Sequence, residues 1–169
     1  MEERIFKAPM DRANKLLTFF LGYVVLIGIP VVISVTLRQE GRLSAATGVI
    51  VAFIILIAFI HSFRITGFKV TSTSIVITRL IKDTYILISE IQSIERDPSP
   101  MRNFTLRLFG MSGIYGSQGI FWNKELGVFR AYVMSANNVI DLQLKNGKHV
   151  FISPHPKDEF IKILNEKLV

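Results

Sequence analysis

The sequence of 169 residues contains no cysteine and only three histidines. The absence of cysteine excludes disulfides, thiol nucleophiles and thiolate metal ligands, and it permits a reducing compartment without requiring one. Neither His149 nor His155 has a serine and a carboxylate nearby in an arrangement typical of a catalytic triad. The histidines also lack the spacing of metal ligands. We therefore expect a non-catalytic protein that uses no metal and no cofactor.

Long runs of like charge are also absent, although the net charge is +7. Without a run of five basic residues the chain lacks the tail typical of nucleic-acid-binding proteins. We expect no nucleic acid and no small-molecule substrate among its partners. A modest basic excess is compatible with an anionic membrane surface.

Long hydrophobic runs are what the chain does contain, and 50% of its residues are hydrophobic. Residues 16–37 include no Asp, Glu, Lys, Arg or His, and in residues 43–63 only His61 titrates. A helix rises about 1.5 Å per residue, so each run spans roughly 30 Å, the thickness of a hydrocarbon core. We predict a transmembrane hairpin over residues 16–63, because paired core helices of soluble proteins are seldom apolar on all sides.

Positive charges flank this hairpin and are sparse in its turn. Lysine and arginine occupy positions 4, 7, 12 and 15 before it and 64, 69, 79 and 82 after it, against positions 38 and 42 in the turn. The positive-inside rule then places both termini in the cytoplasm, with residues 1–15 as a cytoplasmic arm of a multi-pass inner-membrane protein. The first run is longer than the apolar core of a signal peptide, and no small-residue cleavage site follows it.

The two apolar runs carry no buried acid, lysine or arginine, which favours an anchor over an ion pathway. Ala45, Gly48 and Ala52 share one face of the second run. Because small residues allow close helix packing, we expect this face to contact the first helix, with dimerisation as the alternative.

After residue 63 the hydrophobic period changes to two, which predicts strands. The predicted strands cover residues 67–72, 75–81, 84–88, 103–109, 128–134, 139–144 and 148–152. Residues 89–95 fit either a capped helical turn or a strand, and the prolines at 98 and 100 predict a loop. Asn146-Gly147 predicts a tight hairpin. Residues 157–168 predict an amphipathic helix that buries Phe160, Ile163, Leu164 and Leu168.

Glycines recur through residues 110–119. No Gly-Lys-Ser/Thr follows them, so bends or bulges at a corner of the sheet are favoured over a phosphate-binding loop. Phe121 and Trp122 come next, and we favour a core position for them over exposure for binding.

The domain also contains a set of glycine, aromatic and turn motifs, and the arm contains one more: Arg107 with Gly110, Gly119-Ile120-Phe121, Gly127-Val128-Phe129, Tyr132, residues 141–148, Ile152-Ser153-Pro154, Phe160 and residues 6–11. Together these motifs resemble those of bacterial PH-like domain proteins. The resemblance implies a membrane-anchored protein whose fold class is α+β or mainly β. Residues 64–169 would form a PH-like split barrel of seven antiparallel strands, capped by the C-terminal helix. The resemblance implies no catalytic residue.

Three functions from different classes follow. We favour a membrane-tethered interaction module that binds a protein partner or itself. The alternatives are a reader of anionic lipid headgroups and an accessory subunit of a membrane transport or secretion complex. We disfavour specific recognition of phosphoinositides, because the link between the first two predicted strands, residues 71–74, has no basic residue. Arg64 and Lys69 follow the hairpin so closely that they are candidate headgroup contacts.

Arg107, Phe109, Arg130 and Tyr132 are the candidate partner-binding residues. Strand alternation predicts that they point outward, opposite a core that includes Leu106, Leu108, Phe129 and Ala131. Arginine and aromatic residues are enriched in protein-binding hot spots. A solvated sheet face, or an internal ion pair with Asp141, explains the two arginines equally well.

Overall fold

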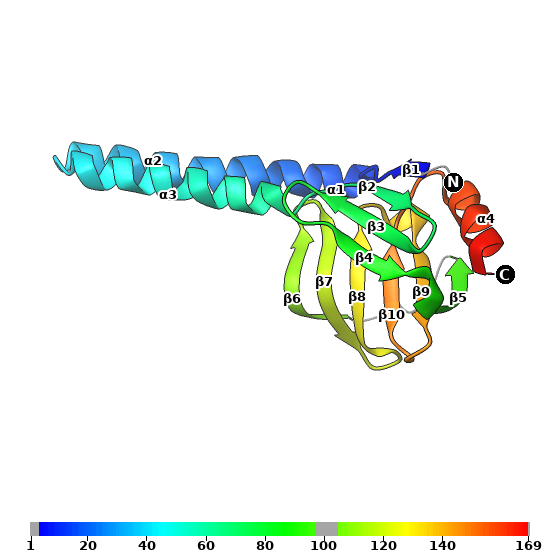
Figure 1. The fold of residues 1–169 in the computed structure, drawn as a ribbon. Coiled ribbons are helices and arrows are strands. Elements are labelled where there is room, and N and C mark those ends of the chain that lie inside the picture. The colour runs from blue at the N-terminus through cyan, green and yellow to red at the C-terminus, as the bar shows by residue number, and fades with distance from the viewer. Residues whose placement is uncertain (1–3, 97–104, 169) are drawn as a thin grey trace.

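The computed structural model describes residues 4–96 and 105–168 (Figure 1). A long helical hairpin is followed by a β-rich domain that ends in a helix. Figure 1 shows the hairpin projecting from one side of the domain, with both termini near the opposite side. The predicted order of two apolar helices, strands and a closing helix is confirmed.

The first helix runs without interruption through three segments, α1 (Arg12–Leu17), the π-helical η1 (Thr18–Val25) and α2 (Leu26–Gln39). The second is α3 (Leu43–Ser62). Both helices are long and apolar enough to cross a membrane. Asp11 caps α1, because its carboxylate accepts a hydrogen bond from Asn14 N at 2.8 Å.

The two helices approach closely at Ala46, which is fully buried and whose carbonyl accepts a hydrogen bond from Ser34 Oγ at 3.2 Å. Gly48 and Ala52, in contrast, are exposed. The expected packing of the Ala45, Gly48 and Ala52 face on the first helix is therefore wrong for those two residues. Ala46, on a neighbouring face, is the small residue that is buried against the first helix.

The strands form two sheets. Sheet A has the order β1 (Arg4–Lys7), β2 (Ile65–Val70), β3 (Ser74–Arg79) and β4 (Thr84–Leu87). Sheet B has the order β5 (Ile91–Arg96), β9 (Ile140–Leu144), β10 (His149–Ile152), β8 (Gly127–Val133), β7 (Gly116–Asn123) and β6 (Leu106–Gly113).

All seven predicted strands have a counterpart, but β1, β5 and β7 add to them, so the count of seven is wrong. The prediction of a purely antiparallel barrel is also wrong, because β10 runs parallel to β8 and the strands divide into two sheets. For residues 89–95 the strand alternative is confirmed by β5, and the 3-10 turn that leads into it (Ile88–Glu90) has no side-chain cap. The loop predicted at residues 97–100 lies outside the described residues, as do residues 103 and 104.

The main core lies between the two sheets and is closed by α4 (Lys157–Leu168), whose predicted bounds are confirmed. Phe160 and Leu164 are fully buried, and Ile161 is buried more deeply than the expected Ile163. The ring of Phe160 packs edge-on against Phe6 of β1, with centroids 5.0 Å apart. The N-terminal strand and the C-terminal helix therefore stabilise each other.

A second, smaller core lies on the other face of sheet B. Its buried members are Phe121, Phe129, Ala131, Val133, Val139 and Phe151. The expected core position is thus confirmed for Phe121, whereas Trp122 is partly exposed. Leu106 and Leu108 are exposed as well, so their assignment to the core is wrong. They lie on β6, and a strand at the edge of a sheet has a neighbour on one side alone.

Candidate functional site

The turn between β6 and β7 is docked onto both helices of the hairpin. Thr18 is buried where η1 begins, and its Oγ1 accepts a hydrogen bond from Tyr115 N at 3.0 Å. The same hydroxyl lies 3.4 Å from the carbonyl oxygen of Gly113. Tyr115 in turn reaches the second helix, where its hydroxyl is 2.8 Å from His61 Nδ1. We call Thr18, His61, Gly113 and Tyr115 the clasp.

Burial and neighbouring side chains both shift the pKa of the Tyr115 phenol. Burial raises the pKa of its phenol above the ordinary value and Tyr23 adds to this, whereas nearby Arg64 lowers it. The phenol is therefore neutral at physiological pH and can donate a hydrogen bond to His61 or accept one. The guanidinium of Arg64 also lies over the Tyr115 ring, 5.6 Å from its centroid.

A second set of contacts ties the base of the first helix to the segment after β8. Asp11 Oδ2 accepts a hydrogen bond from Ala136 N at 2.8 Å. Asn14 Nδ2 donates one to the carbonyl of Met134 at 3.0 Å. Together with the clasp, these bonds fix how the domain is oriented relative to the hairpin.

Two glycines of the glycine-rich segment are explained by the close approach of β6 and β7. Gly110 and Gly119 face each other across β6 and β7. A Cβ added at Gly119 would lie 2.1 Å from the carbonyl oxygen of Phe109, and one added at Gly110 would lie 2.1 Å from that of Gln118. Any side chain here would force the strands apart. The glycines therefore have a geometric role, as predicted, but at Gly110 and Gly119 it is the close approach of two strands and not a bend or bulge.

A cavity of about 460 Å³ lies beside the clasp, between the end of α3 and the face of sheet B that is turned toward sheet A. Phe59 and Phe63 contribute to it from the end of the hairpin, and Arg79 contributes from β3. The main residues from sheet B are Phe109, Ile120, Arg130 and Tyr132. The walls are mostly apolar.

Arg79 and Arg130 are the charged residues among the described lining residues. The guanidinium of Arg79 lies over the Tyr132 ring at 5.1 Å from its centroid, and its Nε is buried without a hydrogen-bond partner. Glu90 shares a small neighbouring pocket with Arg130, but no ion pair joins them. Among the described residues, neither guanidinium forms an ion pair with a carboxylate, although Asp83 Oδ1 accepts a hydrogen bond from the backbone N of Arg79 at 3.0 Å.

Three of the four predicted partner-binding residues meet in this cavity. Phe109 pairs with Ile120, which pairs with Arg130, so these residues share a face with Tyr132. Arg107 pairs with Phe121 and lies on the opposite face. Tyr132 is buried, so its predicted outward orientation is wrong.

Sequence reasoning missed Arg79, Phe59 and Phe63 as lining residues. A signal for Arg79 was present, because it follows Ile75 and Ile77 at a spacing of two and therefore lies on their core-facing side.

The two predicted headgroup contacts lie at different distances from the hairpin. Arg64 directly follows α3 and touches Tyr115. Lys69 lies near the far end of β2, which runs away from the hairpin in Figure 1. Their contact with lipid headgroups stays a prediction.

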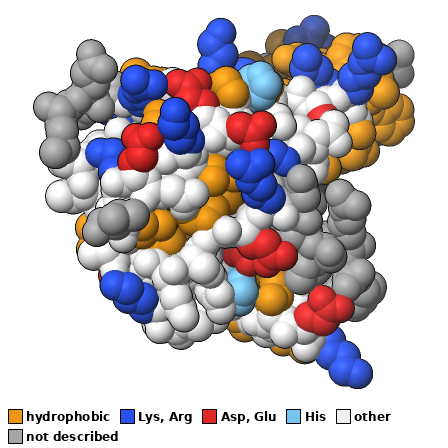
Figure 2. Space-filling model, turned by 90° about the vertical axis from the view of Figure 1, so that its right-hand side faces the viewer, with side chains coloured by type: hydrophobic (Ala, Val, Ile, Leu, Met, Phe, Trp, Pro, Cys, Tyr) orange, Lys and Arg blue, Asp and Glu red, His pale blue; other side chains and the backbone are white. Residues whose placement is uncertain are grey.

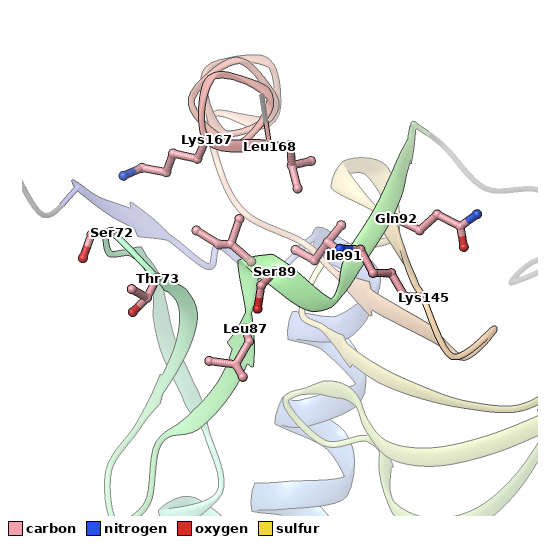
Figure 3. Close-up of a pocket in the computed structure, with 10 residues that line it drawn as sticks. Ser72, Thr73, Leu87, Ser89, Ile91, Gln92, Lys145, Lys167 and Leu168 are labelled. Atoms are coloured by element: carbon pink, nitrogen blue, oxygen red, sulfur yellow. The ribbon is translucent and has the colours of Figure 1, made fainter.

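A second pocket, of about 530 Å³, lies at the far end of the domain (Figure 3). Ser72 and Thr73 line it from the β2–β3 turn, and Lys167 lines it from α4. Lys145 is also present, but Figure 3 shows the amines of the two lysines on different sides of the pocket. The surrounding face carries positive and negative side chains interspersed (Figure 2). This pocket does not concentrate charge of one sign.

Asp141 and His149 form a close pair on the outer face of sheet B, with Oδ2 and Nδ1 2.6 Å apart. Burial raises the pKa of Asp141, and the hydrogen bond from His149 offsets this only in part. The alternative of an ion pair between Asp141 and Arg107 or Arg130 is not realised. Among the described residues, no group of three or more His, Asp or Glu could hold a metal ion.

Comparison with known proteins supports the PH-like interpretation. A sequence model of the family described as Bacterial PH domain matches residues 66–168, which is β2 through α4. No curated protein and no solved structure matches the chain significantly. PH domains are generally non-enzymatic, which favours an interaction module over an enzyme. The chain belongs to the bacterial PH domain family.

Proposed function

We propose that this chain is a membrane-tethered, non-catalytic interaction module that binds a protein partner at the cytoplasmic face of the inner membrane. The helical hairpin crosses the membrane as the anchor, and the PH-like domain carries the binding surface. The partner is a second protein, either another copy of this chain or a subunit of a membrane transport or secretion complex.

One observation carries this proposal, an exposed apolar rim on sheet B. Leu106, Trp122 and Val128 are cross-strand neighbours on β6, β7 and β8, and they are 46%, 37% and 52% exposed. Leu108 and Phe109 extend the rim along β6 and are 57% and 75% exposed. Contiguous exposed apolar surface on a folded domain is typical of an interaction site.

Charge and rigidity make this rim suitable for a protein. Arg107 and Arg130 flank it on the two faces of sheet B, and arginines beside aromatic residues are typical of binding hot spots. The clasp holds the rim in one orientation relative to the hairpin. A pre-oriented surface loses less freedom on binding, which favours affinity.

The test uses the full-length protein in cells with a photo-crosslinking residue at Leu108. Trp122→Ser combined with Val128→Ser removes apolar rim surface that is partly exposed, so the fold should tolerate the change. We expect recovery of the crosslinked partner to fall about tenfold or more, as for the loss of hot-spot contacts. Ile81→Ser is the matched control, because Ile81 is 79% exposed and lies outside the rim. Equal partner recovery from the rim variant and the control would contradict the proposal.

A further inference from the structure

We propose that the cavity beside the clasp holds an anionic phospholipid from the adjacent leaflet. Its phosphate would lie against Arg79 and Arg130, and part of an acyl chain would lie against Phe59, Phe63 and Ile120. This assignment concerns the cavity, which shares Phe109 with the rim and has Arg130 beside it, and it rests on the hairpin crossing the membrane. It does not depend on a protein partner.

The first argument is continuity with the bilayer. Phe59 and Phe63 belong to the last turn of the second apolar helix and to its C-cap, and they are among the exposed residues of the chain. A hairpin that spans the membrane places these rings at the level of the interface, where aromatic side chains are enriched. Figure 1 shows that β6, β7 and β8 lie next to this end of the hairpin. A lipid can therefore reach the cavity by moving laterally, without leaving the membrane.

The second argument is unmatched charge. The lining carries two arginines and, among the described residues, no acid. The buried Nε of Arg79 has no partner, and a buried donor left unpaired is costly. A guanidinium presents several N–H groups in a planar fork that matches the oxygens of a phosphate. An anion in the cavity would lie against the guanidiniums of Arg79 and Arg130 and balance their charge.

The third argument is that neither half of a lipid suffices alone. An inorganic phosphate would satisfy the arginines and leave the walls of Phe63, Phe109 and Ile120 against water. An uncharged apolar molecule would cover those walls and leave the charges of Arg79 and Arg130 without a counter-ion. At about 460 Å³ the cavity lies in the usual size range of ligand pockets, roughly 300–1,000 Å³. It accommodates a headgroup with part of one acyl chain, so the rest of the lipid stays in the leaflet.

The experiment measures lipid retained by the purified full-length protein in detergent, using native mass spectrometry. Phosphatidylglycerol is the anionic probe and phosphatidylethanolamine is the zwitterionic one. We expect about one phosphatidylglycerol per chain. Arg79→Gln with Arg130→Gln should reduce its retention about tenfold or more, because two charged hydrogen-bonding groups are lost. Lys124→Gln with Lys148→Gln removes the same charge from exposed turns and should leave retention unchanged.

A melting measurement keeps the test informative if the variant is less stable. Because a ligand that binds the folded state raises the melting temperature, phosphatidylglycerol should stabilise the wild type and not the arginine variant. Equal retention in the arginine variant and the lysine control would overturn the proposal. So would equal stabilisation by phosphatidylethanolamine, or by inorganic phosphate alone. Loss of the crosslinked protein partner in the arginine variant, with lipid retention unchanged, would assign the cavity to a protein instead.

Discussion

The two ends of the PH-like domain are closed by different physical means. At the end away from the hairpin, α4 seals the core with the apolar side chains of Phe160, Ile161 and Leu164. At the hairpin end, the contacts are hydrogen bonds made by Thr18 and Tyr115, and a partly open cavity remains beside them.

This difference separates stability from binding. Apolar burial supplies most of the free energy that holds a small domain folded, and α4 is where this chain adds it. Hydrogen bonds have strict geometry but contribute less net free energy, so the clasp orients the domain more than it stabilises it. Binding surfaces are commonly drawn from the less sealed parts of a fold. The cavity with its two arginines lies at that end, whereas Leu106, Trp122 and Val128 of the rim lie at the other end of their strands, near the β7–β8 turn.

The largest expected effect tests whether the hairpin end faces the membrane at all. Because the chain has no cysteine, single cysteines at Gly41 and Asn146 can be labelled on a clean background. Gly41 lies in the hairpin turn and should react with an impermeant reagent from outside the cell. Asn146, in the β9–β10 turn, should react only after lysis. The reverse pattern would place the domain outside the cytoplasm and remove the basis for the proposed partners.

The next effect concerns the sealed end. Phe160→Ala should cost about 3–5 kcal/mol, because it removes a fully buried ring from the core and from its contact with Phe6. At about 4–8 °C per kcal/mol, the melting midpoint should fall by well over 10 °C. Fluorescence of Trp122, the single tryptophan, reports unfolding of the domain. Glu166→Ala on the exposed side of α4 is the control and should change stability by less than about 0.5 kcal/mol. Similar midpoints for both variants would show that α4 is not the seal.

The sealed end is also the part that the sequence predicts best. α4 has the predicted bounds because Pro156, early acidic residues and an amphipathic period are all local signals. The apolar helices follow from composition and length in the same way. β1 and β7 were not predicted, for different reasons. β1 is four residues whose pairing partner, β2, lies beyond the whole hairpin, and the strand pattern of β7 is broken by Gly116 and Gly119.

The hairpin end was predicted only in part. Phe109, Arg130 and Tyr132 could be named because arginines and aromatic residues stand out in an alternating pattern. Strand alternation puts Arg107 on the same face as Phe109, and the bulge between these two residues, which the sequence does not signal, turns Arg107 to the opposite face. The contribution of Phe59 and Phe63 depends on how the domain docks, which is set by the clasp and has no local signature.

The smallest expected effect sharpens the distinction between sealing and orienting. Thr18→Val keeps the shape of the side chain but removes the hydroxyl that accepts the hydrogen bond from Tyr115 N. An unpaired buried donor costs about 1–3 kcal/mol, which should weaken the clasp while the core of the domain stays intact. Spin labels on cysteines at Arg38 and Lys148 should then show a broader distribution of distances between hairpin and domain. The melting midpoint reported by Trp122 should change by only a few degrees.

Thr47→Val is the control, because the Thr47 hydroxyl bonds to Leu43 O within its own helix. A narrow distribution of spin-label distances in both variants would contradict this prediction. It would mean that the hydrogen bonds of Asp11 and Asn14 orient the domain without the clasp.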